Sequence, residues 1–146
     1  MNNKRFVSTF SMLLGCLAAF GGQPLAMADS QPLLCAAAEA VVCHKDGACE
    51  RGPVDRVNLP LFFRIDPGSS VVHSLTEAGR RRTSPITGTT TADGITVYTG
   101  TDMTTGWTMV VDRSIGKMTL CLATPGAGYT VFGACLPDMA ASKASE

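Results

Sequence analysis

Several residue patterns that would indicate a catalytic or metal site are missing from this chain of 146 residues. It holds only two histidines, His44 and His73, and no C-x-x-C pair, so its cysteines lack the spacing of zinc ligands. There is no Gly-x-Ser-x-Gly motif, and Cys121 has no basic neighbour in sequence that would activate its thiol. We therefore predict that the protein is not an enzyme and needs no metal or cofactor.

The chain also lacks an excess of charge of either sign, with 12 basic and 12 acidic residues. A surface so close to neutral has no general attraction for nucleic acid, and we expect no nucleic-acid partner. The one basic cluster is formed by Arg80, Arg81 and Arg82, in a segment bounded by Gly and Thr. Such a cluster is usually just solvated, but it is a candidate for binding an anion or a partner.

A long apolar run occurs only near the N-terminus, where Phe6 to Phe20 carries no charge and follows Lys4 and Arg5. Ala26-Met27-Ala28 then supplies the small residues that a leader peptidase requires. The run is too short to span a bilayer, and no second run follows. We predict a signal peptide over residues 1–28, no transmembrane segment, and one domain over residues 29–146 with a short disordered C-terminal tail.

The leader has a second interpretation. Leu13-Leu14-Gly15-Cys16 resembles a bacterial lipobox, in which the cysteine thiol is acylated. The apolar run continues beyond Cys16, however, and a well-formed cleavage site follows. We expect a periplasmic or secreted bacterial protein, with an outer-membrane lipoprotein acylated at Cys16 as the minority alternative.

From Ala38 onward, alternating apolar and polar residues bounded by Gly, Pro, Asp and Ser predict short strands and no convincing helix. Residues 31–40 are rich in Ala and are also compatible with a helical turn. His73 alternates with Val71 and Leu75, which places it on their interior face. The eight expected strands are Glu39–His44, Leu59–Ile65, Val71–Leu75, Thr83–Thr91, Ile95–Thr99, Trp107–Asp112, Met118–Ala123 and Tyr129–Ala134.

The hairpin formed by the sixth and seventh of these strands is the best determined. A turn centred between Ser114 and Ile115 places Trp107 opposite Leu122, and the other apolar pairs follow from the same register. One face is then wholly apolar, and a slip of one residue would turn that face into water. Trp107 is accordingly expected in the core rather than stacked on a ligand.

Sequential strands leave two exposed edges unless the sheet closes, so we predict an all-β, closed antiparallel barrel of about eight strands. In such a barrel the first and last strands are neighbours, which brings Cys35 beside Cys135. We predict a disulfide between them and a second, local one between Cys43 and Cys49, as an exported protein permits. Cys121 remains as the free thiol.

Short motifs spread over nearly all of the chain after the leader carry a resemblance. They are Cys35 with Cys43, Leu59-Pro60 leading to Phe63-Arg64-Ile65-Asp66, Thr83-Ser84-Pro85-Ile86, Gly106-Trp107, Asp112-Arg113 with Gly116, and Phe132-Gly133-Ala134-Cys135. Together they resemble a family of small exported proteobacterial proteins of unassigned function. Cys121 departs from that pattern, where Thr or Val is usual, which agrees with its being unpaired. The resemblance implies no activity.

Two kinds of function without catalysis remain. In the first, an interaction or inhibitor-like module docks on another protein of the bacterial envelope, with Phe132 near Cys121 as a candidate contact and a disulfide-linked dimer through Cys121. In the second, the barrel binds a lipid or another small apolar molecule in its interior. We favour the first, because four large side chains are expected to fill that interior: Trp107, Met109, Leu120 and Leu122.

Overall fold

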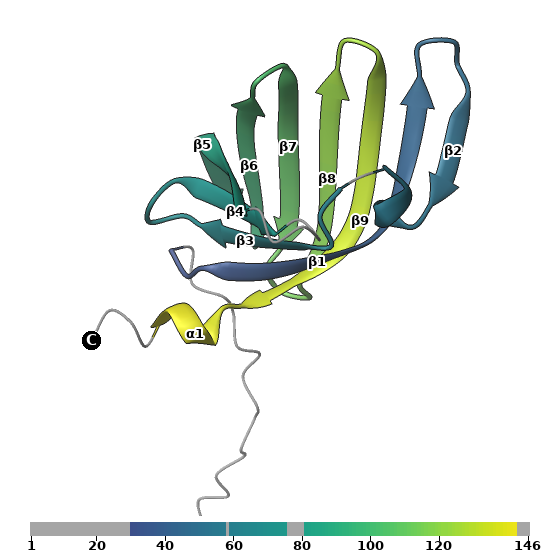
Figure 1. Cartoon of the computed structure of the whole chain (residues 1–146). Coiled ribbons are helices and arrows are strands. Elements are labelled where there is room, and N and C mark those ends of the chain that lie inside the picture. The colour runs from purple at the N-terminus through teal and green to yellow at the C-terminus, as the bar shows by residue number, and fades with distance from the viewer. Residues whose placement is uncertain (1–29, 58, 76–80, 143–146) are drawn as a thin grey trace, which may run out of the picture.

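The computed structural model describes residues 30–57, 59–75 and 81–142 (Figure 1). Three features that the sequence predicted lie outside this part: the leader with Cys16, Arg80 of the basic cluster, and the C-terminal tail. Within it the chain forms nine strands, one 3-10 helix and a short α-helix. They are β1 (Leu33–His44), β2 (Cys49–Gly52), η1 (Val54–Val57), β3 (Phe62–Asp66), β4 (Val71–Leu75), β5 (Arg81–Ala92), β6 (Ile95–Asp102), β7 (Thr105–Asp112), β8 (Lys117–Thr124), β9 (Ala127–Pro137) and α1 (Met139–Ser142).

Eight of the strands close into an antiparallel barrel, which confirms the predicted fold class. From β3 to β9 each strand pairs with the next along the chain, and β1 pairs with both β3 and β9 to complete the ring. The closing pair β1–β9 is the longest ladder, with eleven residue pairs from Leu33–Pro137 to His44–Ala127. The short β2 pairs only with the second half of β1 and extends the sheet at one end of the barrel (Figure 1).

The β7–β8 hairpin has the predicted register. Trp107 lies opposite Leu122, Met109 opposite Leu120, and Val111 opposite Met118. Five of these side chains are buried in the barrel, and Leu122 is half-buried. The alternate residues, such as Val110 and Cys121, are exposed on the outer face, as an alternating strand with one buried face requires.

The first strand begins earlier than the sequence indicated, and the helical turn considered for residues 31–40 does not form. The residues in the first half of β1 alternate in burial. Leu33, Cys35 and Ala37 point inside, and the residues between them point outside. A bulge between Ala37 and Glu39 shifts this alternation by one residue, so that Ala40 also points inward. Ala thus occupies both faces of β1 in spite of its low intrinsic preference for strands.

The predicted facing of β4 is wrong. Val72 is buried and Ser74 lines the interior, so His73 lies on the other face of the strand, between Arg64 on β3 and Thr83 on β5. The apolar alternation of Val71, His73 and Leu75 suggested the opposite. The Ser74 hydroxyl can face inward because this part of the barrel lines a hollow. Burial of apolar side chains therefore does not set the register of β4.

Both predicted disulfides are present. Cys35 and Cys135 lie directly opposite each other in the β1–β9 ladder, fully buried, and are bonded to each other. Cys43 and Cys49 join β1 to β2 around the turn between them. Cys121 on β8 is a free, exposed thiol.

A buried arginine lies in the β7–β8 turn, toward one end of the barrel. The side chain of Arg113, in the β7–β8 turn, is only 4% exposed. Its guanidinium donates to the Thr96 hydroxyl at 2.8 Å and to the Tyr98 hydroxyl at 2.7 Å, and both of these β6 residues are fully buried. A buried charge requires such hydrogen bonds.

Candidate ligand-binding pocket

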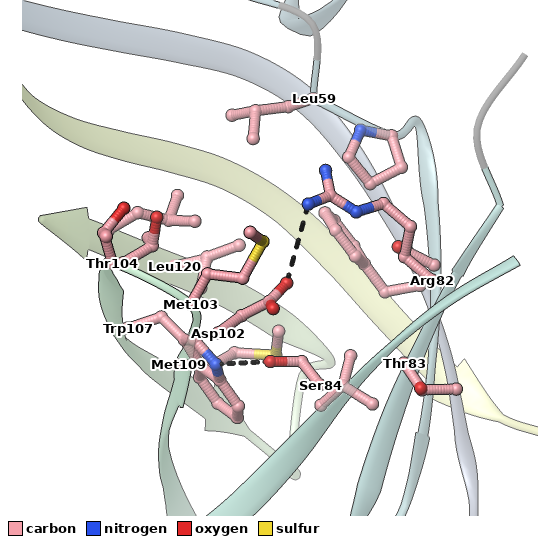
Figure 2. A pocket seen from close by; sticks show the side chains of 16 residues that line it. Leu59, Arg82, Thr83, Ser84, Asp102, Met103, Thr104, Trp107, Met109 and Leu120 are labelled. Carbon is pink, nitrogen blue, oxygen red and sulfur yellow. Dashed lines mark hydrogen bonds and ion pairs between the residues drawn. The ribbon is translucent and has the colours of Figure 1, made fainter. Parts of the chain in front are cut away.

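A pocket of about 350 Å³ opens at the opposite end of the barrel (Figure 2). Its floor and one wall are formed by inward-facing residues of β3, β4, β7 and β8, and Leu59 and Pro60 of the segment before β3 close one side. The β6–β7 turn, with Asp102, Met103 and Thr104, borders its mouth. The apolar lining comes mainly from Phe63, Val72, Trp107, Met109, Leu120 and Leu122.

Trp107 is the central side chain of this pocket. It is 8% exposed, as predicted for a core residue, but its ring also forms part of the pocket wall. The indole Nε1–H donates to the Ser84 hydroxyl on β5 at 2.8 Å, which holds the ring over β6, the strand between them (Figure 2). Gly100 on β6 makes room for it, because a Cβ at that position would overlap both the indole ring and the Pro85 carbonyl oxygen.

The mouth of the pocket carries one basic and one acidic side chain. A guanidinium nitrogen of Arg82, near the start of β5, lies 3.8 Å from a carboxylate oxygen of Asp102 at the end of β6. The Arg82 side chain is 60% exposed and that of Asp102 34%, so water screens their attraction. Met103, next in the turn, is 91% exposed beside this pair. The pocket thus has an apolar interior and a charged rim.

A second hollow, of about 370 Å³, lies beside β1, β2 and η1. Its polar side chains include His44, Glu50, Arg56 and Tyr129. Tyr129 pairs with Leu122 of the first pocket across the β8–β9 ladder, so the two hollows are neighbours on the inner face of the sheet.

Two carboxyl groups with lowered pKa values, Asp66 and Asp112, stabilise turns at the end of the barrel away from the pocket. Burial raises the pKa of Asp66, but hydrogen bonds from Ser69 outweigh it, and the pKa lies below the ordinary value of 3.8. The Ser114 hydroxyl and backbone N–H both donate to Asp112 and lower its pKa in the same way. Neither group lines the pocket.

The residues that the sequence singled out lie on two different surfaces, the outer face of the barrel and the mouth of the pocket. Cys121 and Phe132 both point outward, from β8 and β9, and Phe132 is 42% exposed. Arg82 lies at the mouth of the pocket, and Arg81 is the first residue of β5. The predicted basic cluster is therefore represented at the pocket by Arg82 alone among the described side chains.

The expectation that four large side chains fill the barrel is not met. Trp107, Met109, Leu120 and Leu122 form a wall, and the space beside them is open. Sequence reasoning missed the facing wall, which contains Ser74 and Ser84. In β4 the alternation of Val71, His73 and Leu75 indicated the wrong face as the inner one, and the Thr-rich β5 has no apolar alternation that marks an inner face.

Over the described ranges, no three His, Cys, Asp or Glu side chains gather closely enough to hold a metal ion. No helix in that part of the chain has the length and apolar character needed to cross a bilayer. The sequence matches no protein-family model and none of the curated proteins with which it was compared.

Proposed function

We propose that this protein binds a small apolar or amphipathic molecule in the pocket at the open end of its barrel. The observation that supports the proposal is a cavity of about 350 Å³ with a mostly apolar lining and a few polar groups at its rim. Ligand sites of soluble proteins have this combination. At about 30 Å³ for each water-sized group, the cavity has room for about a dozen heavy atoms.

Core packing alone does not account for this space. Protein interiors are close-packed, and a small domain has few voids larger than a water molecule. Here Trp107 and Met109 are almost completely buried, yet both border open space. The buried Arg113 cluster lies toward one end of the barrel and the pocket opens at the other, which agrees with a barrel that holds a single ligand.

We also propose that the protein works outside the cytoplasm. Two disulfides are compatible with an oxidising compartment, and the predicted leader and the resemblance to exported proteobacterial proteins point the same way.

The binding proposal can be tested with decan-1-ol, a neutral apolar probe of suitable size. Trp107 is the only tryptophan, so the fluorescence of the oxidised protein reports on the pocket directly. We expect a saturable change in emission and a rise in the midpoint of thermal unfolding with the alcohol.

Two neighbouring substitutions on β8 provide a matched pair for this titration. Leu122→Glu places a carboxylate in the pocket wall and should abolish the response. Ala123→Glu places the same charge on the exposed face and should retain it. Absence of a response from the unmodified protein, or an equal response from both variants, would overturn the proposal.

A second candidate is the interaction module of the bacterial envelope, favoured by apolar side chains on the outer face. Leu34 is 46% exposed on β1, Phe62 49% on β3, and Leu136 70% on β9, and both Phe62 and Leu136 border β1. Exposed apolar patches of this kind mark interaction sites. A protein captured from envelope extract by the unmodified protein, lost with Leu136→Ser and retained with Thr130→Ala, would support this function. Failure of the alcohol titration would leave this candidate ahead.

A further inference from the structure

We propose that the ligand of the pocket is an anionic amphiphile, an apolar body with a carboxylate group, and that Arg82, Ser74 and Ser84 bind the carboxylate. This inference depends on the proposed function, because it concerns the chemistry of the same site.

The three groups stand together on one wall of the pocket. Arg82 and Ser84 are two residues apart on β5, and both line the pocket. Ser74 on β4 lies directly opposite Arg82 in the β4–β5 ladder. The two serines therefore flank Arg82 in the sheet, one across the ladder and one along the strand.

Each of the three side chains has at least one N–H or O–H hydrogen that makes no hydrogen bond within the described part of the chain. The Ser84 hydroxyl accepts from Trp107, so its own hydrogen is left to donate. The Ser74 hydroxyl has no hydrogen bond to any of the described residues. Arg82 has Asp102 as its ion-pair partner in that part of the chain, at a separation of 3.8 Å that is longer than a hydrogen bond.

A carboxylate would complete this set of donors. Arg82 presents several N–H groups in a planar fork, and a carboxylate accepts two of them in parallel at shorter distances than the present pair shows. The ligand would compete with Asp102 for the guanidinium, and the exposed Arg82–Asp102 pair is weak enough to be exchanged. The hydroxyls of Ser74 and Ser84 would add neutral donors to the same anion.

The facing wall selects the rest of the ligand. Trp107, Met109 and Leu120 line the side formed by β7 and β8, so a chain extending from the carboxylate would lie against apolar surface (Figure 2). A pocket with room for about a dozen heavy atoms fits a molecule of the size of decanoate.

The test compares decanoate with decan-1-ol at neutral pH, using Trp107 fluorescence and calorimetry on the oxidised protein. A hydrogen bond to a charged group strengthens binding more than a neutral one, so we expect decanoate to bind at least about tenfold more tightly than the alcohol. Acetate serves as the headgroup without the chain, and we expect it not to displace either probe.

Three variants assign the anion to its site. Arg82→Gln should reduce decanoate affinity by about tenfold and leave the affinity for decan-1-ol within a factor of two or three. Asp102→Asn should increase the affinity for decanoate, because it removes the competing carboxylate. Arg56→Gln, in the neighbouring hollow, is the matched control and should change neither affinity.

The outcomes separate the two proposals. If neither probe binds, the proposed function is wrong. If both bind equally and Arg82→Gln has no effect, the pocket binds apolar molecules but the anionic class is wrong. If Arg56→Gln abolishes the preference for decanoate, the anion binds in the neighbouring hollow and our assignment is overturned. Should Arg82→Gln fail to fold, Arg82→Lys, which retains the charge but not the planar fork, should keep part of the preference.

Discussion

Removal of the Cys35–Cys135 disulfide tests the closure of the barrel. The bond links residues 100 positions apart, whereas the Cys43–Cys49 bond spans only 6. A disulfide stabilises mainly by restricting the unfolded chain, and the restriction grows with the logarithm of the loop length. By that relation the long loop contributes about 4.7 kcal/mol and the short one about 2 kcal/mol.

We therefore expect the double variant Cys35→Ala/Cys135→Ala to lose about 2–3 kcal/mol more stability than Cys43→Ala/Cys49→Ala. Alanine is preferred to serine because both residues of the first pair are fully buried, and a hydroxyl there would lack a partner. The β1–β9 ladder provides eleven residue pairs without the bond, so the barrel should still close.

Equilibrium unfolding in urea, without reductant, measures the difference. With an m-value of about 1.5 kcal/mol/M, the loss of the long-range bond should lower the midpoint by roughly 3 M. If the variant shows no cooperative unfolding transition because it is already unfolded without urea, the loss of stability is at least that large. Equal losses from the two double variants, or a larger loss from the short-range pair, would refute the argument that the Cys35–Cys135 bond acts by joining the distant ends of the sheet.

Three further predictions concern the pocket, the turns and the thiol. Gly100→Ala should destabilise the protein by about 1–3 kcal/mol and shift the tryptophan emission, whereas Gly106→Ala, which meets no atom within 4 Å, should have little effect on either measurement. Because the folded-state pKa of Asp66 is lowered, its contribution to stability is complete above the ordinary value of 3.8 and is lost as the pH falls through the folded-state pKa. Asp66→Asn, which keeps an acceptor oxygen, should therefore make the acid-induced fall in the free energy of unfolding shallower. An unchanged dependence of that free energy on acid pH would contradict this assignment. Under oxidising conditions a fraction of the protein should run as a dimer on a non-reducing gel, and Cys121→Ser should abolish that band; a dimer that persists in the variant would rule out the thiol as the link.

The hairpin of β7 and β8 shows how far local pattern can lead. Its apolar residues alternate without interruption, and only one register buries all of them, so the pairing of Trp107 with Leu122 could be predicted and is confirmed. The partner of Cys35 followed from the closed, sequential topology and that of Cys43 from local spacing, and both disulfides are confirmed.

The pattern failed where the inner face is not apolar. In β4, Ser74 faces inward beside Arg82, and an alternation rule assigns such residues to the solvent. In β1 a bulge after Ala37 changes the face of every later residue, and no local signal marks the extra residue. The strand β2 was missed because only its pairing with β1 makes that short polar segment a strand.

The sequence by itself determined the all-β class, the order of most strands and the cysteine pairs, because these depend on periodicity and on the neighbours that a closed meander imposes. Only the tertiary structure decided that the buried Arg113 cluster lies toward one end of the barrel and that the other end is hollow. The reason is physical: whether inward-facing side chains meet across the barrel or leave space between them depends on the bending of β1 and on the angles at which strands cross. Those quantities are set by contacts between residues far apart in the chain, such as Trp107 with Ser84, and alternation within one strand does not carry them.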